Sequence, residues 1–423
     1  MIQKLKQILY FPVAGYFRFW ARLQFNRWNP RVVLVTGSSG KTTLLHMLES
    51  QIGKRAHYSH HANSAFGIPF DILGFPPRSN AKSEWIDLFI TAPFRAFKKP
   101  LNESIYVVEA DSDRPGEAEF ISSLVKPEVT IWLSSDKSHS YNFDSQVADG
   151  LFLDVREAIA YEFGAYLAAA AKLAIINDSE ALIINQGDRT SAKIEAVRPD
   201  TITGYAIKAD HTVFKIDGTT YTVPGLVPQE AGLSMAAVVE ACRYLGIEVD
   251  KKFSSFIAPP GRSTVFKGIK KTTLIDSTYN AIPDAVRAVL GLFAKYPGKP
   301  KWLVISDMLE QGDSEADEHR AIAESIAKLN LDRIILMGPR MSKYTAPRLK
   351  ELLGDKAPIE VFLKPRPVLD YLQNHLKGGE IILFKGSRFL DGVVEHLLSD
   401  PSDEAKLCRR GPVWQRRREQ WEL

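Results

Sequence analysis

The feature that most constrains this chain is a glycine-containing loop, Thr36-Gly37-Ser38-Ser39-Gly40-Lys41-Thr42-Thr43. β-Branched residues at 31–35 predict a strand before the loop, and the pattern at 42–52 predicts a helix after it. The amides of such a loop can cradle phosphates, while Lys41 neutralises the β- and γ-phosphates and the Thr42 hydroxyl holds Mg²⁺. Because Val35 stands where the general motif has glycine, we interpret the loop as a shortened nucleotide-binding variant. The alternative is a tight turn with an incidental lysine.

Apolar strands and helices alternate on both sides of a proline-rich boundary. Before it, the sequence predicts strands at 104–109, 129–133 and 181–185, an alanine-rich helix at 157–173, a hairpin around Asp217-Gly218, and a helix at 231–245 that ends at Gly246. After Pro259-Pro260-Gly261, it predicts strands at 273–276, 301–306, 333–337, 359–363 and 380–384. A helix at 315–329 is expected to begin with a capping box of Ser314 and Asp317.

This alternation predicts an α/β fold with two parallel sheets, each covered on both faces. We expect a P-loop domain with a parallel sheet and a small β-hairpin region at 30–258. A second doubly wound, Rossmann-like domain is expected at 259–400. Residues 1–29 are expected to form a helical arm with a break at Pro12, and residues 401–423 a basic tail.

Composition excludes several classes of protein. Of the 423 residues, 45% are hydrophobic and 25% charged, which is typical of a soluble globular chain. The two cysteines, Cys242 and Cys408, are too few for a zinc ribbon or an iron–sulfur cluster and fit a reducing compartment, so we expect a cytoplasmic protein. Residues 1–31 hold six basic residues and no acidic ones, which leaves 48 basic against 50 acidic residues elsewhere. The body is therefore not expected to bind nucleic acid.

The arm adds eight aromatic residues to its basic ones: Tyr10, Phe11, Tyr16, Phe17, Phe19, Trp20, Phe25 and Trp28. Rings and cations without acids suit a membrane interface, so one interpretation is a peripheral contact through residues 1–29 at the inner face of the membrane. The other is a helix packed on the following domain, with Phe17, Trp20 and Phe25 buried. No segment has the ~20 apolar residues that a membrane span needs.

Two further residues are expected near the phosphate loop. Glu109 ends a predicted strand, where open α/β sheets bind ligands, and its carboxylate can reach the Mg²⁺ of a neighbouring phosphate loop. His139 follows the next strand end, Leu133, by six residues. The alternatives are a solvated strand end for Glu109 and a structural role for His139.

Together these motifs resemble those of the Mur ligase superfamily, the ATP-dependent amide ligases of peptidoglycan and folylpolyglutamate synthesis. The phosphate loop is close to the family's loop. The other similar segments are Asn63–Pro69 (N-N-x-x-G-x-P), Glu109 with Arg114–Glu117 (E…P-G-E), Ser134-Ser135 with His139 (T-N-x-x-x-H), and Pro260-Gly261-Arg262 (the Gly-Arg that opens the last domain).

The second half of the chain resembles the branch of this family that adds D-alanyl-D-alanine. The similar segments are Asp276–Pro283 (D-x-Y-N-A-N-P, with one extra residue), Asp307–Gly312 with His319 (G-D-M-x-E-L-G…H), and Lys385–Arg388 (K-G-S-R). The D-N-P-R signature of the diaminopimelate-adding branch is absent.

The chain departs from that branch at three places. Members usually begin with a domain that holds the UDP-sugar, whereas the phosphate loop here starts at residue 36. They usually carry a carbamylated lysine that helps to bind a second Mg²⁺, but the matching stretch at 159–163 has no lysine. Either Glu162 supplies a carboxylate instead, or the site holds one metal. Leu233 stands where an asparagine near the nucleotide is expected.

The resemblance implies an enzyme that forms amide bonds through an acyl phosphate, with ATP and Mg²⁺ as cofactors. A peptidoglycan precursor and an amino acid or dipeptide are the implied substrates. The implied catalytic residues are Lys41, Glu109 and His139, and the implied metal ligands are Thr42, Glu109 and His139. The implied nucleotide contacts are Thr36, Gly37, Ser38, Ser39, Gly40, Lys41, Thr42, Thr43, Arg262, Asp276 and Asn280. The implied substrate contacts are Asn63, Lys385, Ser387 and Arg388; for Lys385 and Arg388 a surface loop is the alternative.

Three other functions stay open. A ligase for another polymer or for a lipid-linked muropeptide fits the missing UDP-binding domain and the aromatic arm. A non-catalytic nucleotide-binding scaffold fits the missing lysine and Leu233. A P-loop switch or transport ATPase is disfavoured by the second α/β domain with Arg262 and Asp276.

Overall fold

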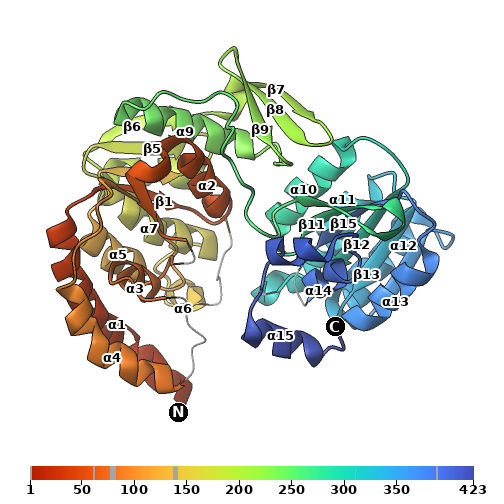
Figure 1. Cartoon of the computed structure of the whole chain (residues 1–423), viewed down its shortest axis with the longest axis horizontal. Helices are drawn as coiled ribbons and strands as arrows, with labels where there is room; N and C mark the ends of the chain where they lie inside the picture. The colour runs from red at the N-terminus through yellow and green to blue at the C-terminus, as the bar shows by residue number, and fades with distance from the viewer. Residues whose placement is uncertain (1, 61, 77–81, 137–141, 310, 387–388) are drawn as a thin grey trace. The chain divides into compact units, whose positions relative to one another are not determined.

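The structure is a computed structural model that describes residues 2–60, 62–76, 82–136, 142–309, 311–386 and 389–423 (Figure 1). The chain forms two compact units. Unit 1 comprises Met1–Thr201 and Leu233–Asp250, and unit 2 comprises Ile202–Gly232 and Lys251–Leu423. The domain ranges expected from the sequence remain a prediction, because units defined by contacts need not coincide with domains.

Unit 1 is built on a six-stranded parallel sheet with the strand order β2-β3-β1-β4-β5-β6. Its strands are β1 (Arg31–Thr36), β2 (Ala56–Tyr58), β3 (Ile105–Glu109), β4 (Val129–Trp132), β5 (Leu173–Asn177) and β6 (Lys193–Val197). The central strands are buried along nearly their whole length, which explains why they read as continuous apolar runs. Since the strands are parallel, the segments that follow β1, β3 and β4 begin at one edge of the sheet.

The helices of unit 1 connect and cover these strands. They are α1 (Ile2–Trp28), α2 (Lys41–Ile52), α3 (Gly67–Ile72), α4 (Lys82–Ala96), α5 (Glu117–Val125), α6 (Asp144–Ala148), α7 (Val155–Ala168), α8 (Ala181–Ile184) and α9 (Ala231–Leu245), the last of which begins at the boundary with unit 2. None of the helices in the described part of the chain is long and apolar enough to cross a bilayer.

Two sequence predictions for unit 1 are wrong. Residues 181–184 form helix α8 rather than a strand, and the strand lies earlier, at Leu173–Asn177. A short apolar run does not distinguish a buried strand from a buried helical turn, so the choice depends on pairing with neighbouring strands. Helix α1 also continues through Pro12 without the expected break. Tertiary packing along α1 offsets the roughly 3 kcal/mol that an interior proline costs.

The arm packs on the body of unit 1. Helix α1 lies along α4 and also contacts α3 and α5 (Figure 1). Phe17 is fully buried and Phe25 is 7% exposed, whereas Trp20 is half-buried at the edge of the same core. These positions favour the interpretation of the arm as a packed helix.

Unit 2 contains a six-stranded sheet with the order β10-β11-β15-β12-β13-β14. Its strands are β10 (Thr264–Lys267), β11 (Thr273–Ser277), β12 (Lys301–Ser306), β13 (Arg333–Met337), β14 (Ile359–Phe362) and β15 (Ile381–Lys385). Only β10 is antiparallel to its neighbour among these described strands. The helices are α10 (Pro283–Lys295), α11 (Glu315–Ala327), α12 (Ala346–Leu353), α13 (Pro365–His375), α14 (Leu390–Glu395) and α15 (Pro412–Glu419).

Two apolar cores show that helices cover both faces of this sheet. One core contains residues of α10, α11 and α12, and the other contains residues of α13 and α14. The predicted second α/β fold is therefore confirmed.

The predicted hairpin is also confirmed, and a third strand extends it. It forms an antiparallel sheet of β7 (Ile202–Ile207), β8 (His211–Ile216) and β9 (Thr219–Pro224), which packs with unit 2. The predicted capping box of α11 is wrong. Ser314 has φ −82° and ψ 3° rather than an extended conformation, and its hydroxyl donates to the Gln311 carbonyl at 2.8 Å. A capping side chain needs the extended backbone that aims it at the helix amides.

Candidate functional site

The phosphate loop lies between β1 and α2 and depends on two glycines. Gly37 has φ +128°, and a Cβ atom there would lie 2.9 Å from the Ser134 carbonyl oxygen. Gly40 has φ +78° at the start of α2. Only glycine adopts these conformations without strain, so the loop geometry follows directly from the sequence.

Lys41 is folded across this loop. Its ammonium group donates to the Gly37 carbonyl at 2.5 Å and pairs with the Asp111 carboxylate at 3.0 Å. The lysine side chain is 9% exposed. A bound phosphate would therefore compete with Asp111 for a cation that is already in position.

The segment after β4 holds the loop from the other side. The Ser39 amide donates to the Ser134 hydroxyl at 2.9 Å, and the Ser38 amide donates to the Ser134 carbonyl at 3.1 Å. The Asp136 amide donates to the Ser38 hydroxyl at 2.9 Å. His139 lies outside the described residues, so its place beside Glu109 stays a prediction.

Thr42 and Glu109 meet as the sequence predicted. The Thr42 hydroxyl donates to the Glu109 carboxylate at 3.2 Å, and the Glu109 amide donates to the Ser59 hydroxyl at 2.8 Å. Neighbouring oxygens of an octahedral Mg²⁺ site are ~2.9 Å apart, because each bond is ~2.0–2.1 Å long. The two side chains therefore fit adjacent positions around Mg²⁺. At the loop's edge, the Thr36 hydroxyl donates to the Ala110 carbonyl at 2.9 Å.

Helix α9 also approaches the loop. A Cβ atom on Gly40 would lie 3.9 Å from the hydroxyl oxygen of Ser234, the residue that follows Leu233. Sequence reasoning stopped at Leu233 and missed Ser234.

The Asn63–Pro69 and Arg114–Glu117 segments meet around one buried carboxylate. Glu117 accepts hydrogen bonds from the Ala65 amide at 2.8 Å, the Asp113 amide at 3.1 Å and the Tyr10 hydroxyl at 2.7 Å. Burial of Glu117 raises the pKa of its carboxyl group. The Arg114 guanidinium lies 3.5 Å from the centre of the Tyr10 ring.

Tyr10 on the arm therefore helps to hold this buried carboxylate. The sequence did not reveal this role, because the aromatic residues of the arm were interpreted only as a group. Asn63 is partly buried, and its backbone carbonyl accepts a hydrogen bond from the Asp111 backbone amide at 2.8 Å. This bond connects the Asn63–Pro69 segment to the carboxylate that pairs with Lys41.

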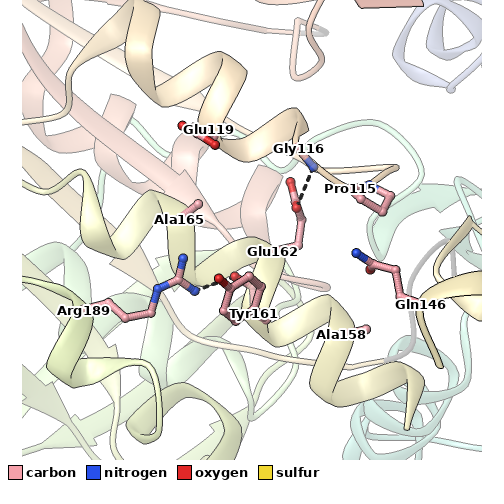
Figure 2. Close-up of a pocket in the computed structure, with 9 residues that line it drawn as sticks. All are labelled: Pro115, Gly116, Glu119, Gln146, Ala158, Tyr161, Glu162, Ala165 and Arg189. Carbon is pink, nitrogen blue, oxygen red and sulfur yellow. Dashed lines mark hydrogen bonds between the residues drawn. The ribbon is translucent and has the colours of Figure 1, made fainter. Parts of the chain in front are cut away.

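The oxygens of Glu162 are engaged by donors of the chain itself. One oxygen accepts from the Ser112 hydroxyl and the Ala118 amide, each at 2.7 Å, and the other accepts from the Gly116 amide at 2.8 Å. Figure 2 shows Glu162 pointing at Gly116. Both residues line a hollow of about 550 Å³, part of which is open to solvent. The carboxylate accepts hydrogen bonds from amides at the N-terminus of α5, where the helix dipole favours negative charge. This arrangement favours a structural role for Glu162 over that of a metal ligand.

In unit 2, three predicted residues lie within electrostatic range of one another. Burial and the charge of Arg262 lower the pKa of Lys385 to about 7. Burial raises the pKa of Asp276 to about 6, opposed by hydrogen bonds from Thr278. One Asp276 oxygen accepts from the Thr278 amide at 3.0 Å and hydroxyl at 2.6 Å, whereas the other is buried without a hydrogen-bond partner in the described part of the chain. That oxygen is suited to accept a hydrogen bond from a ligand hydroxyl.

The other predicted residues of unit 2 do not form a described cluster with these three. Asn280 is exposed, and its side-chain oxygen accepts from the Ala281 amide at 2.7 Å. Ser387 and Arg388 lie outside the described residues. His319 contacts the residue after Asp307, since its Nε2 accepts a hydrogen bond from the Met308 amide at 3.2 Å. Burial lowers the pKa of His319, and the bond to Met308 identifies a neutral ring with a structural role.

Comparisons with known proteins show which proteins this chain is similar to. A family model described as Mur ligase, glutamate ligase domain, matches residues 261–388. A UDP-N-acetylmuramoyl-tripeptide–D-alanyl-D-alanine ligase from Bacillus subtilis strain 168 is 26% identical over 395 residues, which cover 88% of this chain and 76% of the relative. Over most of its length the chain is similar to enzymes of the Mur ligase family. An enzyme of the same name from Escherichia coli strain K12 is 24% identical, over 79% of this chain and 70% of the relative.

Solved structures show that the fold of this chain is shared by known proteins. The MurF ligase of Thermotoga maritima in complex with ADP superposes with a TM-score of 0.69 at 22% identity, covering 92% of this chain and 84% of that one. Escherichia coli FolC in complex with ADP superposes with a TM-score of 0.57 at 18% identity, covering 89% and 93%.

Proposed function

We propose that this protein is an ATP-dependent, ADP-forming amide ligase of the Mur ligase family, and that it adds D-alanyl-D-alanine, or an amine like it, to a carboxylate of a peptidoglycan precursor in the cytoplasm. The observation that carries the proposal is the assembled phosphate site of unit 1, where Lys41 crosses the loop and Thr42 meets Glu109. The enzyme names of the relatives support the choice of substrates.

The proposed reaction has two steps. A substrate carboxylate attacks the γ-phosphorus of ATP, so that ADP leaves and an acyl phosphate forms. An amine then attacks the acyl carbon, loses a proton, and phosphate leaves from the tetrahedral intermediate. Lys41 and the loop amides stabilise the charge on the transferred phosphoryl group. Holding carboxylate, phosphate and amine in line supplies much of the acceleration.

Metal and substrate contacts complete the proposal. Mg²⁺ held by Thr42 and Glu109, with His139 as the third proposed ligand, would neutralise phosphate charge. Arg262, Asp276 and Asn280 are proposed nucleotide contacts. The proposed contacts of the peptide substrates are Asn63, Lys385, Ser387 and Arg388.

A phosphate-release screen tests this proposal. Purified protein with ATP and Mg²⁺ should release phosphate only when a muropeptide and D-alanyl-D-alanine are both present, and Lys41→Ala should abolish the release. A response to a different amine would move the protein to another branch of the family. No release with any pair of substrates would favour the non-catalytic scaffold.

A second candidate function, ligation of a lipid-linked muropeptide, is favoured by an apolar face on unit 1. This apolar face consists of Phe19 on α1 and Ile86, Ile90, Phe94 and Phe97 on or directly after α4, which are 56–72% exposed. The α4 residues are spaced three or four positions apart and so form one stripe. Trp20 joins the two helices, since its ring lies 5.0 Å from Phe19 and 6.5 Å from Phe97.

We propose that this apolar face rests on an anionic membrane surface. The exposed residues Arg22, Lys98 and Lys99 belong to the same two segments, and each cation near such a surface contributes roughly 1 kcal/mol. Removing the arm is a poor test, because it would take Phe17 and Phe25 out of the core. The proposed contact instead involves side chains that can be changed without opening the core.

Vesicle flotation distinguishes the outcomes. The full chain should float with vesicles that contain phosphatidylglycerol and less with pure phosphatidylcholine. The double variant Ile90→Ser with Phe94→Ser should lose flotation, whereas Leu153→Ser, at an exposed apolar residue elsewhere in unit 1, should not. Equal flotation of both variants would refute the contact. A shift from dimer to monomer in the double variant would instead assign the face to a second copy of the chain.

A further inference from the structure

Three side chains that can bind a metal meet on unit 1, apart from the Thr42–Glu109 pair. His46 and Glu49 lie on α2, and His60 follows β2 by two residues. A Glu49 carboxylate oxygen lies 3.1 Å from Nε2 of His60 and 3.8 Å from Nδ1 of His46. All the potential ligand atoms lie within 4.8 Å of one another, which holds for no other trio of His, Cys, Asp or Glu among the described residues.

These separations suit a tetrahedral ion. Bonds of ~2.0–2.1 Å to imidazole nitrogen and carboxylate oxygen place neighbouring ligand atoms ~3.3 Å apart at the corners of a tetrahedron. The separations of 3.1 Å and 3.8 Å lie on either side of that value. The side chains of His46, Glu49 and His60 are 19%, 39% and 35% exposed, so an ion can enter from solvent and keep water as its fourth ligand.

We propose that His46, Glu49 and His60 form a binding site for a divalent transition metal of the Zn²⁺ class. Two imidazoles and one carboxylate are a ligand set for such ions, whereas Mg²⁺ prefers oxygen ligands and keeps several waters. The site is therefore chemically distinct from the one at Thr42 and Glu109. Within the chain itself, Glu49 and His60 form a polar contact at the surface.

The metal would also fix the position of the proposed magnesium ligands. Thr42, His46 and Glu49 are spaced four and three residues apart on α2 and so share one face of that helix. The hydroxyl oxygen of Ser59, next to His60, accepts a hydrogen bond from the Glu109 amide at 2.8 Å. An ion bound by the trio would therefore link α2, which contains Thr42, to the segment after β2, which contacts Glu109 through Ser59. This second part rests on the proposed function, whereas metal binding itself does not.

Direct titration tests the binding. Metal-free full-length protein, without Mg²⁺ or nucleotide, should bind one Zn²⁺ per chain in calorimetry, and Co²⁺ should give the intense visible absorption of a tetrahedral complex. The double variant His46→Gln with His60→Gln should lose at least about a hundredfold in affinity, since even partners outside the ligand shell contribute 10–100-fold. His211→Gln is the matched control, because His211 pairs with Asp210 at 2.7 Å outside the trio. Its affinity should not change.

Each further result has a defined meaning. Equal Zn²⁺ affinity in the double variant and the parent, or an octahedral Co²⁺ spectrum, would overturn the site. Zn²⁺ should raise the melting temperature of the parent but not of the double variant, and circular dichroism checks that both are folded. Zn²⁺ should also strengthen binding of Mg²⁺ with nucleotide several-fold in the parent only; an unchanged affinity would overturn the link to Thr42 and Glu109. A failure of the proposed function can be distinguished from a failure of the metal site. In that case Zn²⁺ would still bind, but phosphate would not be released.

Discussion

Replacing Glu162 by glutamine should destabilise unit 1 and leave the binding of Mg²⁺ with nucleotide unchanged. The carboxylate accepts from the Ser112 hydroxyl, the Ala118 amide and the Gly116 amide, and the residue is 9% exposed. A glutamine can keep its oxygen toward Ser112 and Ala118. Its NH₂ group then faces the Gly116 N–H, so one acceptor is replaced by a donor.

The magnitude follows from these contacts. A hydrogen bond to a charged group contributes about 1.5–3 kcal/mol, and the substitution removes one such bond and weakens the other two by removing the charge. We therefore expect a loss of about 2–4 kcal/mol. In a unit of about 200 residues, each kcal/mol shifts the melting temperature by ~2–4 °C, so the midpoint of unit 1 should fall by roughly 5–15 °C.

Calorimetric unfolding and titration with Mg²⁺ and ADP measure the two quantities separately. Glu119→Gln is the control, since Glu119 lines the same hollow (Figure 2) but is exposed. It should change the melting temperature by less than about 2 °C, as most exposed substitutions do. An unchanged melting temperature of the Glu162 variant together with weaker Mg²⁺ binding would refute this reasoning. Glu162 would then be the metal ligand that replaces the carbamylated lysine.

Three other predictions concern Lys41, Tyr10 and Lys385. Lys41→Ala should abolish nucleotide binding in calorimetry while circular dichroism stays unchanged, and a full ligation rate would contradict the phosphate-loop assignment. Tyr10→Phe should cost about 1.5–3 kcal/mol in thermal unfolding, because it removes a donor from the buried Glu117 carboxylate; faster proteolysis of the arm should accompany it, and an unchanged melting temperature would show that the bond contributes nothing. The pKa of Lys385 is about 7 in the folded protein and 10.5 when unperturbed, so the unfolded chain binds the extra proton between these values. Stability should therefore rise with pH from 7 to 9 by up to about 1.4 kcal/mol per unit, and Lys385→Met should lose this rise in melting temperature.

Local sequence determined the alternation of strands and helices and the form of the phosphate loop. A loop that needs positive φ at Gly37 and Gly40 has few other conformations, and Asp217-Gly218 dictates a tight hairpin turn for the same reason. The sequence also placed Glu109 beside Thr42, because parallel strands bring their carboxyl ends to one edge. These predictions succeeded because each rests on geometry within a few residues or on a general rule of sheets.

Tertiary structure alone decided the contacts between distant segments. Composition left two interpretations of the arm, and packing against α3 and α4 decided that Phe17 lies inside while Phe19 stays outside. Tyr10 reaches Glu117 over 107 positions of sequence, and Glu162 serves amides more than 40 positions away. The strand at 173–177 likewise depended on pairing with β4 rather than on its own apolar pattern. Periodicity records only which face a residue occupies, whereas the partner on that face is set by how the sheet and its helices bring separate segments together.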